Sequence, residues 1–549
     1  MAGAVAHDGA AAVSRETSAE RLFAPAVAAC TAAVAAFLAF RLTAWPPHED
    51  ETLALFVGRD SLDGMLGTVL NQRGGAPLHF VFAWIVVHPG GGLGALRAVS
   101  ALFAVASVPL LAMLGARLAG RGPAVVATIL ASASWMLLFH GVYGRMYSLF
   151  LCTSLLSFLA LLKATEAGGR GRWAAWVVAT LLCVAAHPYG ALVLATQAVY
   201  AAVTRLRLRE AAASFVVVLV LGAPFWRTDL VLAGRFEIGV GGGGGRLGSP
   251  LDVLRYLERT FSDFTAGYRL AVGGVVALAA LGAYSLARAR PRSALLAGAV
   301  VLTPAVLLML ARFGSAAAPE SRHLIFVLPF FLVLVATGIV SGAGYLGRAG
   351  TPAAVVAICG LVSLQVAWGW SRTAELYRGE PAARVAARGA AAEWLAKTSR
   401  RDDVLFGYDP LYLEAWRAGG ELSRSVVPRA DPRLALRALQ AAEPLGRGVW
   451  VFDASDTGNP VRRLEVPNGP PTPRGSFETR TFGPFMVVRT RAPTNNVRSY
   501  LKLARRAQLA GKALSIADAD VNLLTVVEAA GRLADQERER EDSRSTASR

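Results

Sequence analysis

Long apolar runs separated by short polar connections occupy the first 370 or so residues of the chain. The first run, residues 22–42, carries no charge before Arg41 and is long enough to cross a bilayer as a helix. Similar runs predict further spans at residues 93–116, 123–140, 146–163, 173–186, 189–204, 212–225, 269–287, 293–311, 323–345 and 352–370. The pattern therefore predicts a polytopic α-helical membrane protein with about eleven transmembrane helices.

Residues 77–88 form a shorter apolar run, which would be only about 18 Å long as a helix. We interpret it as a juxtamembrane helix that lies on the membrane surface. If residues 77–88 do not cross the membrane, the loops that carry basic residues lie on the same side as the N-terminus. These basic residues include Arg117, Lys163, Arg205, Arg288 and Arg348. The positive-inside rule makes that side cytoplasmic, so we expect a multi-pass protein of the plasma (inner) membrane with a cytoplasmic N-terminus.

The pattern changes after residue 371. Residues 382–397 predict an amphipathic helix, residues 403–408 and 448–452 predict buried strands, and residues 477–489 predict a strand pair. We therefore expect four parts: a disordered cytoplasmic N-terminus (1–21), a transmembrane domain (22–371) with an outer loop (43–92), a small extracytoplasmic α/β domain (372–492), and a charged helical tail (493–549).

Composition supports the membrane assignment and excludes other classes. Only 17% of residues are charged and mean hydropathy is +0.44, whereas soluble proteins carry about 25% charged residues. The net charge of +18 comes from basic loops and tails, without basic segments interleaved with aromatics, so nucleic acid is not an expected partner.

The four cysteines lie in apolar runs without CxxC spacing, which argues against disulfides or a zinc site. The glycine run at 239–245 lacks the lysine and flanking elements of a phosphate loop.

An acidic segment, Pro-Pro-His-Glu-Asp-Glu at residues 46–51, directly follows the first span. Carboxylates at such a boundary can accept a proton from a hydroxyl nucleophile or bind a divalent cation, and Asp50 and Glu51 are the candidates. The alternative is that these acids cap the helix that follows. His48 and Glu49 are candidate supporting residues, and His48 could equally be a hydrated interface residue.

Other polar residues lie at span ends that the topology assigns to the outer face; they are His79, Arg145, Tyr147, His187, Arg322 and His323. An arginine fork matches the oxygens of a lipid phosphate. The alternative is that the arginines snorkel beside interface tyrosines and that the histidines anchor or cap helices.

The order of these motifs resembles the C-type (GT-C) membrane glycosyltransferases, especially the branch with protein O-mannosyltransferases and the bacterial aminoarabinose transferase. The matches are Asp50-Glu51 in the first outer loop, Pro77-Leu78 with Phe80, Gly90 through Arg97, Arg145-Met-Tyr-Ser-Leu149, His187-Pro-Tyr189, and Glu320-Ser-Arg-His-Leu324 through Pro329. The chain departs from the family where Val142-Tyr143 replace Gln-Glu and Gly75-Ala76 replace His-Pro.

This resemblance implies transfer of a sugar from a polyprenyl-phosphate carrier to a hydroxyl of a glycan, lipid or protein acceptor, by inverting displacement at the outer face. Asp50 would be the base, and Glu51 would orient the acceptor or share a divalent cation, Mg²⁺ or Mn²⁺, with Asp50. The donor phosphate and sugar would be bound by Arg145, Tyr147, Arg322 and His187. Two alternatives stay open: a transporter or flippase for a lipid-linked sugar, and a non-catalytic relative, to which the departures point.

Overall fold

The computed structural model describes residues 2–236, 249–311, 320–423, 425–429, 431–454, 475–512 and 519–547. The glycine run at 239–245 lies outside the described residues. The chain divides into two compact units. We call residues 1–43, 69–230 and 242–371 the membrane unit, and residues 44–68, 231–241 and 372–549 the sheet unit.

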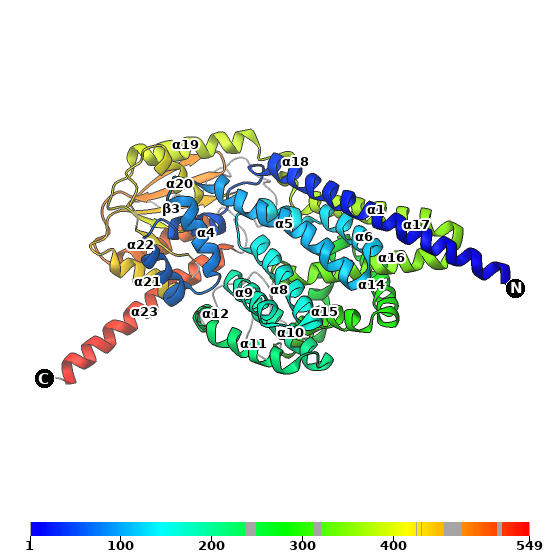
Figure 1. The fold of residues 1–549 in the computed structure, drawn as a ribbon. Helices are drawn as coiled ribbons and strands as arrows, with labels where there is room; N and C mark the ends of the chain where they lie inside the picture. The colour runs from blue at the N-terminus through cyan, green and yellow to red at the C-terminus, as the bar shows by residue number, and fades with distance from the viewer. Residues whose placement is uncertain are drawn as a thin grey trace. The chain divides into compact units, whose positions relative to one another are not determined.

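The membrane unit is helical (Figure 1). Its main helices are α1 (Ala2–Arg41), α4 (Pro77–Val87), α5 (Leu93–Ala119), α6 (Arg121–Ala133), α7 (Trp135–Val142), α8 (Tyr147–Ala167), α9 (Arg170–Ala186), α10 (Gly190–Thr204), α11 (Leu208–Leu221), α12 (Ala223–Phe236), α13 (Pro250–Phe261), α14 (Arg269–Ala289), α15 (Pro291–Ala311), α16 (Leu328–Tyr345) and α17 (Gly350–Arg372). A 3-10 helix, η3 (Ser321–Val327), leads into α16. Each predicted span coincides with one of these helices or with two that meet at a bend.

Among the described residues, six helices are long and apolar enough to cross a membrane, or eight if each of two bent pairs counts as one span. The pairs are α6 with α7, bent by 51°, and α11 with α12, bent by 59°. The protein is thus a polytopic membrane protein, but eleven spans are not confirmed, because α9 and α10 have only 17 and 15 residues. A helix needs about 20 residues to cross the hydrocarbon core. Helix α1 begins at Ala2, so helical backbone includes the segment expected to be disordered.

Helices α8 and α16 are mostly buried, whereas few residues are buried in α17 and in residues 21–41 of α1. Helices α14 and α16 approach closely at Gly282 and Gly338, where an added Cβ would collide with the facing backbone. Small residues allow such close backbone contact between membrane helices. The polar ends of α8 and α16 are therefore anchored in the core of the unit.

The sheet unit contains a five-stranded mixed sheet in the order β2-β1-β3-β5-β4. Its strands are β1 (Val404–Phe406), β2 (Val426–Val427), β3 (Gly448–Asp453), β4 (Phe477–Phe482) and β5 (Phe485–Thr490). Strands β2, β1 and β3 are parallel, and β5 is antiparallel to β3 and β4. Buried runs such as Gly-Val-Trp-Val-Phe predict strands covered on both faces, as observed here.

Helices cover both faces of this sheet (Figure 1). Residues of α19 (Ala382–Thr398) and α20 (Pro410–Arg417) pack on one face. The other face is covered by α21 (Pro432–Ala441), α22 (Val497–Lys512) and α23 (Ala519–Ala547). The segment that we expected to be a separate charged tail therefore contributes Tyr500 and Val526 to the same buried core as Trp450.

The sheet unit also includes part of the expected outer loop of the transmembrane domain. Helices α2 (Glu49–Val57) and α3 (Leu62–Thr68) lie within residues 44–68, which cluster with the sheet. The acidic segment at residues 46–51 thus belongs to the sheet unit in the structure.

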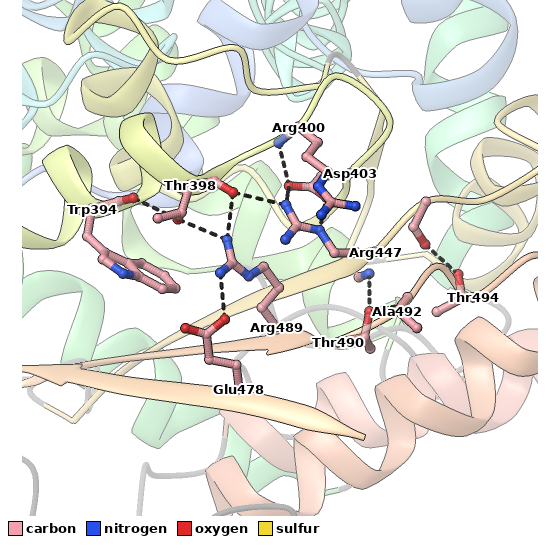
Figure 2. A network of polar contacts seen from close by, with 12 residues as sticks. Trp394, Thr398, Arg400, Asp403, Arg447, Glu478, Arg489, Thr490, Ala492 and Thr494 are labelled. Carbon is pink, nitrogen blue, oxygen red and sulfur yellow. Dashed lines mark hydrogen bonds and ion pairs between the residues drawn. The ribbon is translucent and has the colours of Figure 1, made fainter. Parts of the chain in front are cut away.

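Figure 2 shows a polar network at the amino end of the parallel strands. Arg447 donates two hydrogen bonds of 2.8 Å to the fully buried carboxylate of Asp403. Arg447 and Arg489 also share the carbonyl oxygen of Thr398, at 3.0 and 2.9 Å, and Arg489 pairs with Glu478 at 2.6 Å. Buried charges are stable only when paired and hydrogen-bonded, so this network is a structural anchor.

Candidate active site

The acidic segment forms the first turn of α2. His48 is the N-cap, and its Nδ1 accepts from the backbone N–H of Asp50 at 3.1 Å. The buried Glu51 carboxylate accepts from the backbone N–H of His48 at 3.2 Å, which completes a capping box. The structure therefore shows the capping role for His48 and Glu51, and the catalytic role expected of Asp50 stays a prediction.

Glu49 and Asp50 lie beside this cap but differ in their surroundings. Glu49 accepts a 2.9 Å hydrogen bond from the N–H of Tyr408 and forms an ion pair with Arg429. Asp50 is half-buried in the first turn of the helix. A partly accessible carboxylate on a fixed helix end can take a proton from a hydroxyl group.

The membrane unit gathers a second set of predicted residues at neighbouring helix ends. Tyr147 begins α8, His187 follows α9, and Arg322 and His323 lie in η3 before α16. The ring centroid of Tyr147 lies 5.7 Å from that of His187 and 6.0 Å from that of His323. The Cζ of Arg322 lies 5.3 Å from the Tyr147 ring centroid. Three segments that are far apart in sequence thus meet here, with His187, Arg322 and His323 around Tyr147.

His140 and Tyr189 also pack against these residues. We call the six residues the aromatic-basic cluster: His140, Tyr147, His187, Tyr189, Arg322 and His323. The Tyr189 ring stacks on His323 with centroids 5.3 Å apart, and the His140 ring lies 4.7 Å from Tyr147. Arg145 lies just before α8, and its backbone oxygen accepts from Ser100 at 3.2 Å. Arg145 is close enough to interact electrostatically with His140, His187 and His79.

Local hydrogen bonds hold two of the histidines. Nδ1 of His187 accepts from the backbone N–H of Tyr189 at 3.1 Å, and Nδ1 of His323 accepts from the N–H of Glu320 at 3.1 Å. Glu320 also pairs with Arg322 at 2.8 Å. These bonds fix the ring orientations. Together with the nearby Arg145, the cluster offers two guanidinium groups and several hydrogen-bonding rings, a combination that suits an anion.

His140 is a site residue that the sequence analysis did not select. Its side chain is buried, and neither ring nitrogen has a hydrogen-bond partner among the described residues. Leaving a buried polar group unpaired costs about 1–3 kcal/mol, which indicates a site that a ligand or water completes. The only hint in the sequence was a histidine within the apolar run before Arg145.

His79 lies in α4, near Arg145. It is buried, its ring packs edge-on against Phe80, and its Nε2 has no hydrogen-bond partner among the described residues. It is therefore buried within the unit rather than exposed at an interface.

The structure offers limited support for a metal centre. Within the described parts of the chain, no group of three or more His, Cys, Asp or Glu side chains could hold a metal ion. Asp50 and Glu51 supply two carboxylates, and that of Glu51 is engaged in the helix cap. A shared divalent cation at this pair stays a prediction.

Comparison with known proteins bears on the fold. No family model matches the chain, and no curated protein matches its sequence. Among solved structures, ArnT from Cupriavidus metallidurans bound to undecaprenyl phosphate is similar with a TM-score of 0.54 and 16% identity, over 85% of this chain and 97% of ArnT. The apo structure of the same protein gives 0.50 and 15%, over 86% and 98%. The chain therefore has the fold of the GT-C glycosyltransferases, as the motif order indicated.

Proposed function

We propose that this protein is a glycosyltransferase that moves a sugar from a polyprenyl-phosphate donor to a hydroxyl group of a glycan, lipid or protein acceptor. It would act in the plasma (inner) membrane, with its N-terminus in the cytoplasm and the sheet unit outside. The aromatic-basic cluster is the main support, because it converges from α7, α8, α9 and η3 on a set of groups that suit a phosphate. The similar ArnT structure holds undecaprenyl phosphate, which is a lipid phosphate of this kind.

In the proposed reaction the acceptor oxygen attacks the anomeric carbon while the bond from that carbon to the phosphate oxygen breaks. Negative charge then accumulates on the departing lipid phosphate. Arg145 and Arg322 would stabilise this charge, and Tyr147 and His187 would donate hydrogen bonds to the phosphate or sugar. Preorganised donors of this kind stabilise the transition state more than the ground state.

Asp50 would take the proton of the acceptor hydroxyl as the new glycosidic bond forms, and a single displacement of this type inverts the anomeric configuration. Glu51 would orient the acceptor side, since its carboxylate already holds the backbone of His48. A divalent cation, if bound by Asp50 and Glu51, would supply Lewis-acid stabilisation of oxygen ligands. The other steps use only side chains of this chain.

The test is transfer from a panel of labelled polyprenyl-phosphate sugars in membranes that contain wild-type protein, Asp50→Asn or Asp60→Asn. Asp60 is an exposed aspartate just beyond α2, so its substitution is the matched control. We expect Asp50→Asn to lower kcat by about 10²–10⁴-fold, the range of general base catalysis, and Asp60→Asn to resemble wild type. Transfer that survives in Asp50→Asn would remove Asp50 as the base.

The same membranes separate the two alternatives. Movement of the lipid-linked sugar across the bilayer without transfer would indicate a flippase. Binding of the donor without transfer or movement would indicate a non-catalytic relative, in which Val142 and Tyr143 replace polar family residues.

A further inference from the structure

The carboxyl ends of the parallel strands β1 and β2 carry a group of contacts that the proposed reaction does not use. Tyr408 follows β1 by two residues, and Arg429 follows β2 by two residues. In α/β sheets, ligands bind outside the carboxyl ends of parallel strands. Here a segment of the same chain, helix α2, occupies this edge.

Glu49 is the centre of this contact. One carboxylate oxygen accepts from the N–H of Tyr408 at 2.9 Å, and the other pairs with the guanidinium of Arg429. One turn further along α2, the hydroxyl of Thr52 donates to the carbonyl oxygen of Tyr408. Two polar contacts on one residue and a third on its helical neighbour fix both position and rotation of the first turn.

Aromatic contacts extend the attachment along α2. The Phe56 ring lies 5.5 Å from the Tyr408 ring and 4.8 Å from the Trp416 ring, between centroids. The guanidinium of Arg59 lies 3.8 Å from the Trp416 ring centroid. Such aromatic pairs stabilise a contact beyond simple burial, so α2 is held at its far end as well as at its first turn.

Gly407 provides the space for Arg429. Its φ of +84° is disfavoured for residues with a side chain, and an added Cβ would collide with the Nε, Cδ and Cγ atoms of Arg429. The arginine therefore crosses the backbone at the end of β1 to reach Glu49. Only 16% of the Arg429 side chain and 26% of the Glu49 side chain are exposed, so solvent screens the pair less than a surface pair.

We infer that Glu49 and Arg429 are positioning residues: through their ion pair over Gly407, the sheet holds the first turn of α2 so that Asp50 keeps one orientation. The inference rests on the proposed function, in which Asp50 is the base. Glu49 itself is committed to Tyr408 and Arg429 and acts through its neighbour in sequence. A base that moves by about 1 Å can lose about 10²-fold in rate, which is the reason for such an attachment.

The first experiment measures the attachment without any activity assay. Amide hydrogen exchange is followed in the full-length protein for wild type, Glu49→Gln, Arg429→Met and the control Arg401→Met, which breaks an exposed pair with Glu421 in the same unit. We expect exchange at residues 53–57 to become about tenfold faster in both attachment variants and to stay unchanged in the control. Unchanged exchange at residues 449–452 of β3 shows that the sheet remains folded.

The second experiment measures transfer. We expect kcat to fall by about 10²-fold in Glu49→Gln and in Arg429→Met, with little change in KM for the donor. The double variant should be no slower than either single variant, because both remove the same ion pair.

The outcomes are distinguishable. Unchanged exchange at residues 53–57 in both variants would overturn the attachment, and faster exchange with normal kcat would overturn the positioning role. Additive losses in the double variant would show two independent effects and would also overturn it. Absence of transfer by the wild-type protein would contradict the proposed function, while the exchange experiment would still decide whether the attachment exists.

Discussion

The aromatic-basic cluster and the acidic segment are held in different ways. The cluster is built from helix ends inside the membrane unit, and its rings contact one another at centroid distances of 4.7–6.0 Å. The acidic segment is the first turn of a short helix, kept in place by its own cap and by an ion pair and hydrogen bonds to Arg429 and Tyr408. The proposed phosphate-binding groups are thus held mainly by ring packing between helix ends, whereas the proposed base lies on one short helix that polar and aromatic contacts attach to the sheet.

Within the membrane unit, the largest effect is expected from removing its cationic groups. Arg145→Met or Arg322→Met should each lower kcat by about 10²–10³-fold, by analogy with the loss of one oxyanion donor. Arg117→Met is the control, since Arg117 forms an exposed pair with Glu166 at 2.8 Å. Transfer rates from single-turnover experiments check this. Equal losses in Arg117→Met would point to general destabilisation and contradict the assignment.

A smaller effect is expected from substitution of His140, on stability and on the donor KM. Because both buried ring nitrogens lack partners among the described residues, His140→Phe should leave stability unchanged or raise it. If His140 bonds the charged donor, the same variant should raise the donor KM by about tenfold. Thermal unfolding and transfer kinetics are measured on the same preparation. A stable variant with an unchanged KM would remove His140 from the cluster's binding role.

The smallest effect concerns pH in the sheet unit. Burial raises the pKa of Asp409 to about 7, against the partial opposition of Arg429 and a hydrogen bond from the N–H of Leu411. The pKa of an aspartate in an unfolded chain is about 3.9. Since the folded state favours the protonated carboxyl, stability is present below about pH 4 and is lost as pH rises through about 7.

Asp409→Asn should abolish this dependence, because the amide is neutral and its oxygen can still accept from the N–H of Leu411 at 2.9 Å. Hydrogen exchange at residues 411–415 of α20, corrected for intrinsic rates, is compared between pH 5.5 and pH 8. Asp402→Asn, at an exposed position, should behave as wild type. A wild-type protein with equal protection at both pH values would contradict the raised pKa.

Much of the architecture followed from local pattern. Long apolar runs predicted the helices α5, α8 and α16, and short, continuously apolar runs predicted the strands β1 and β3. A helix in lipid and a strand between two helix layers both need continuous apolar sequence. The number of spans was less predictable. A bend between α6 and α7, or the short length of α10, depends on packing rather than on hydropathy.

The sequence by itself determined the residue types of the candidate site: Asp50, Arg145, Tyr147, His187 and Arg322 stood out as polar groups at the ends of apolar runs. Only tertiary structure decided which of them meet, since the Tyr147–His187 and Tyr147–His323 contacts join helices far apart in the chain.

Tertiary structure also decided that Glu49 belongs to Arg429 and that His140 belongs to the cluster. Neither contact can be read from the sequence around these residues. The Glu49–Arg429 ion pair, for example, needs a positive φ at Gly407 and free space at the end of one strand. Hydropathy reports where a residue lies relative to lipid and core. The partner of a polar side chain depends on how distant elements pack, which the local pattern does not encode.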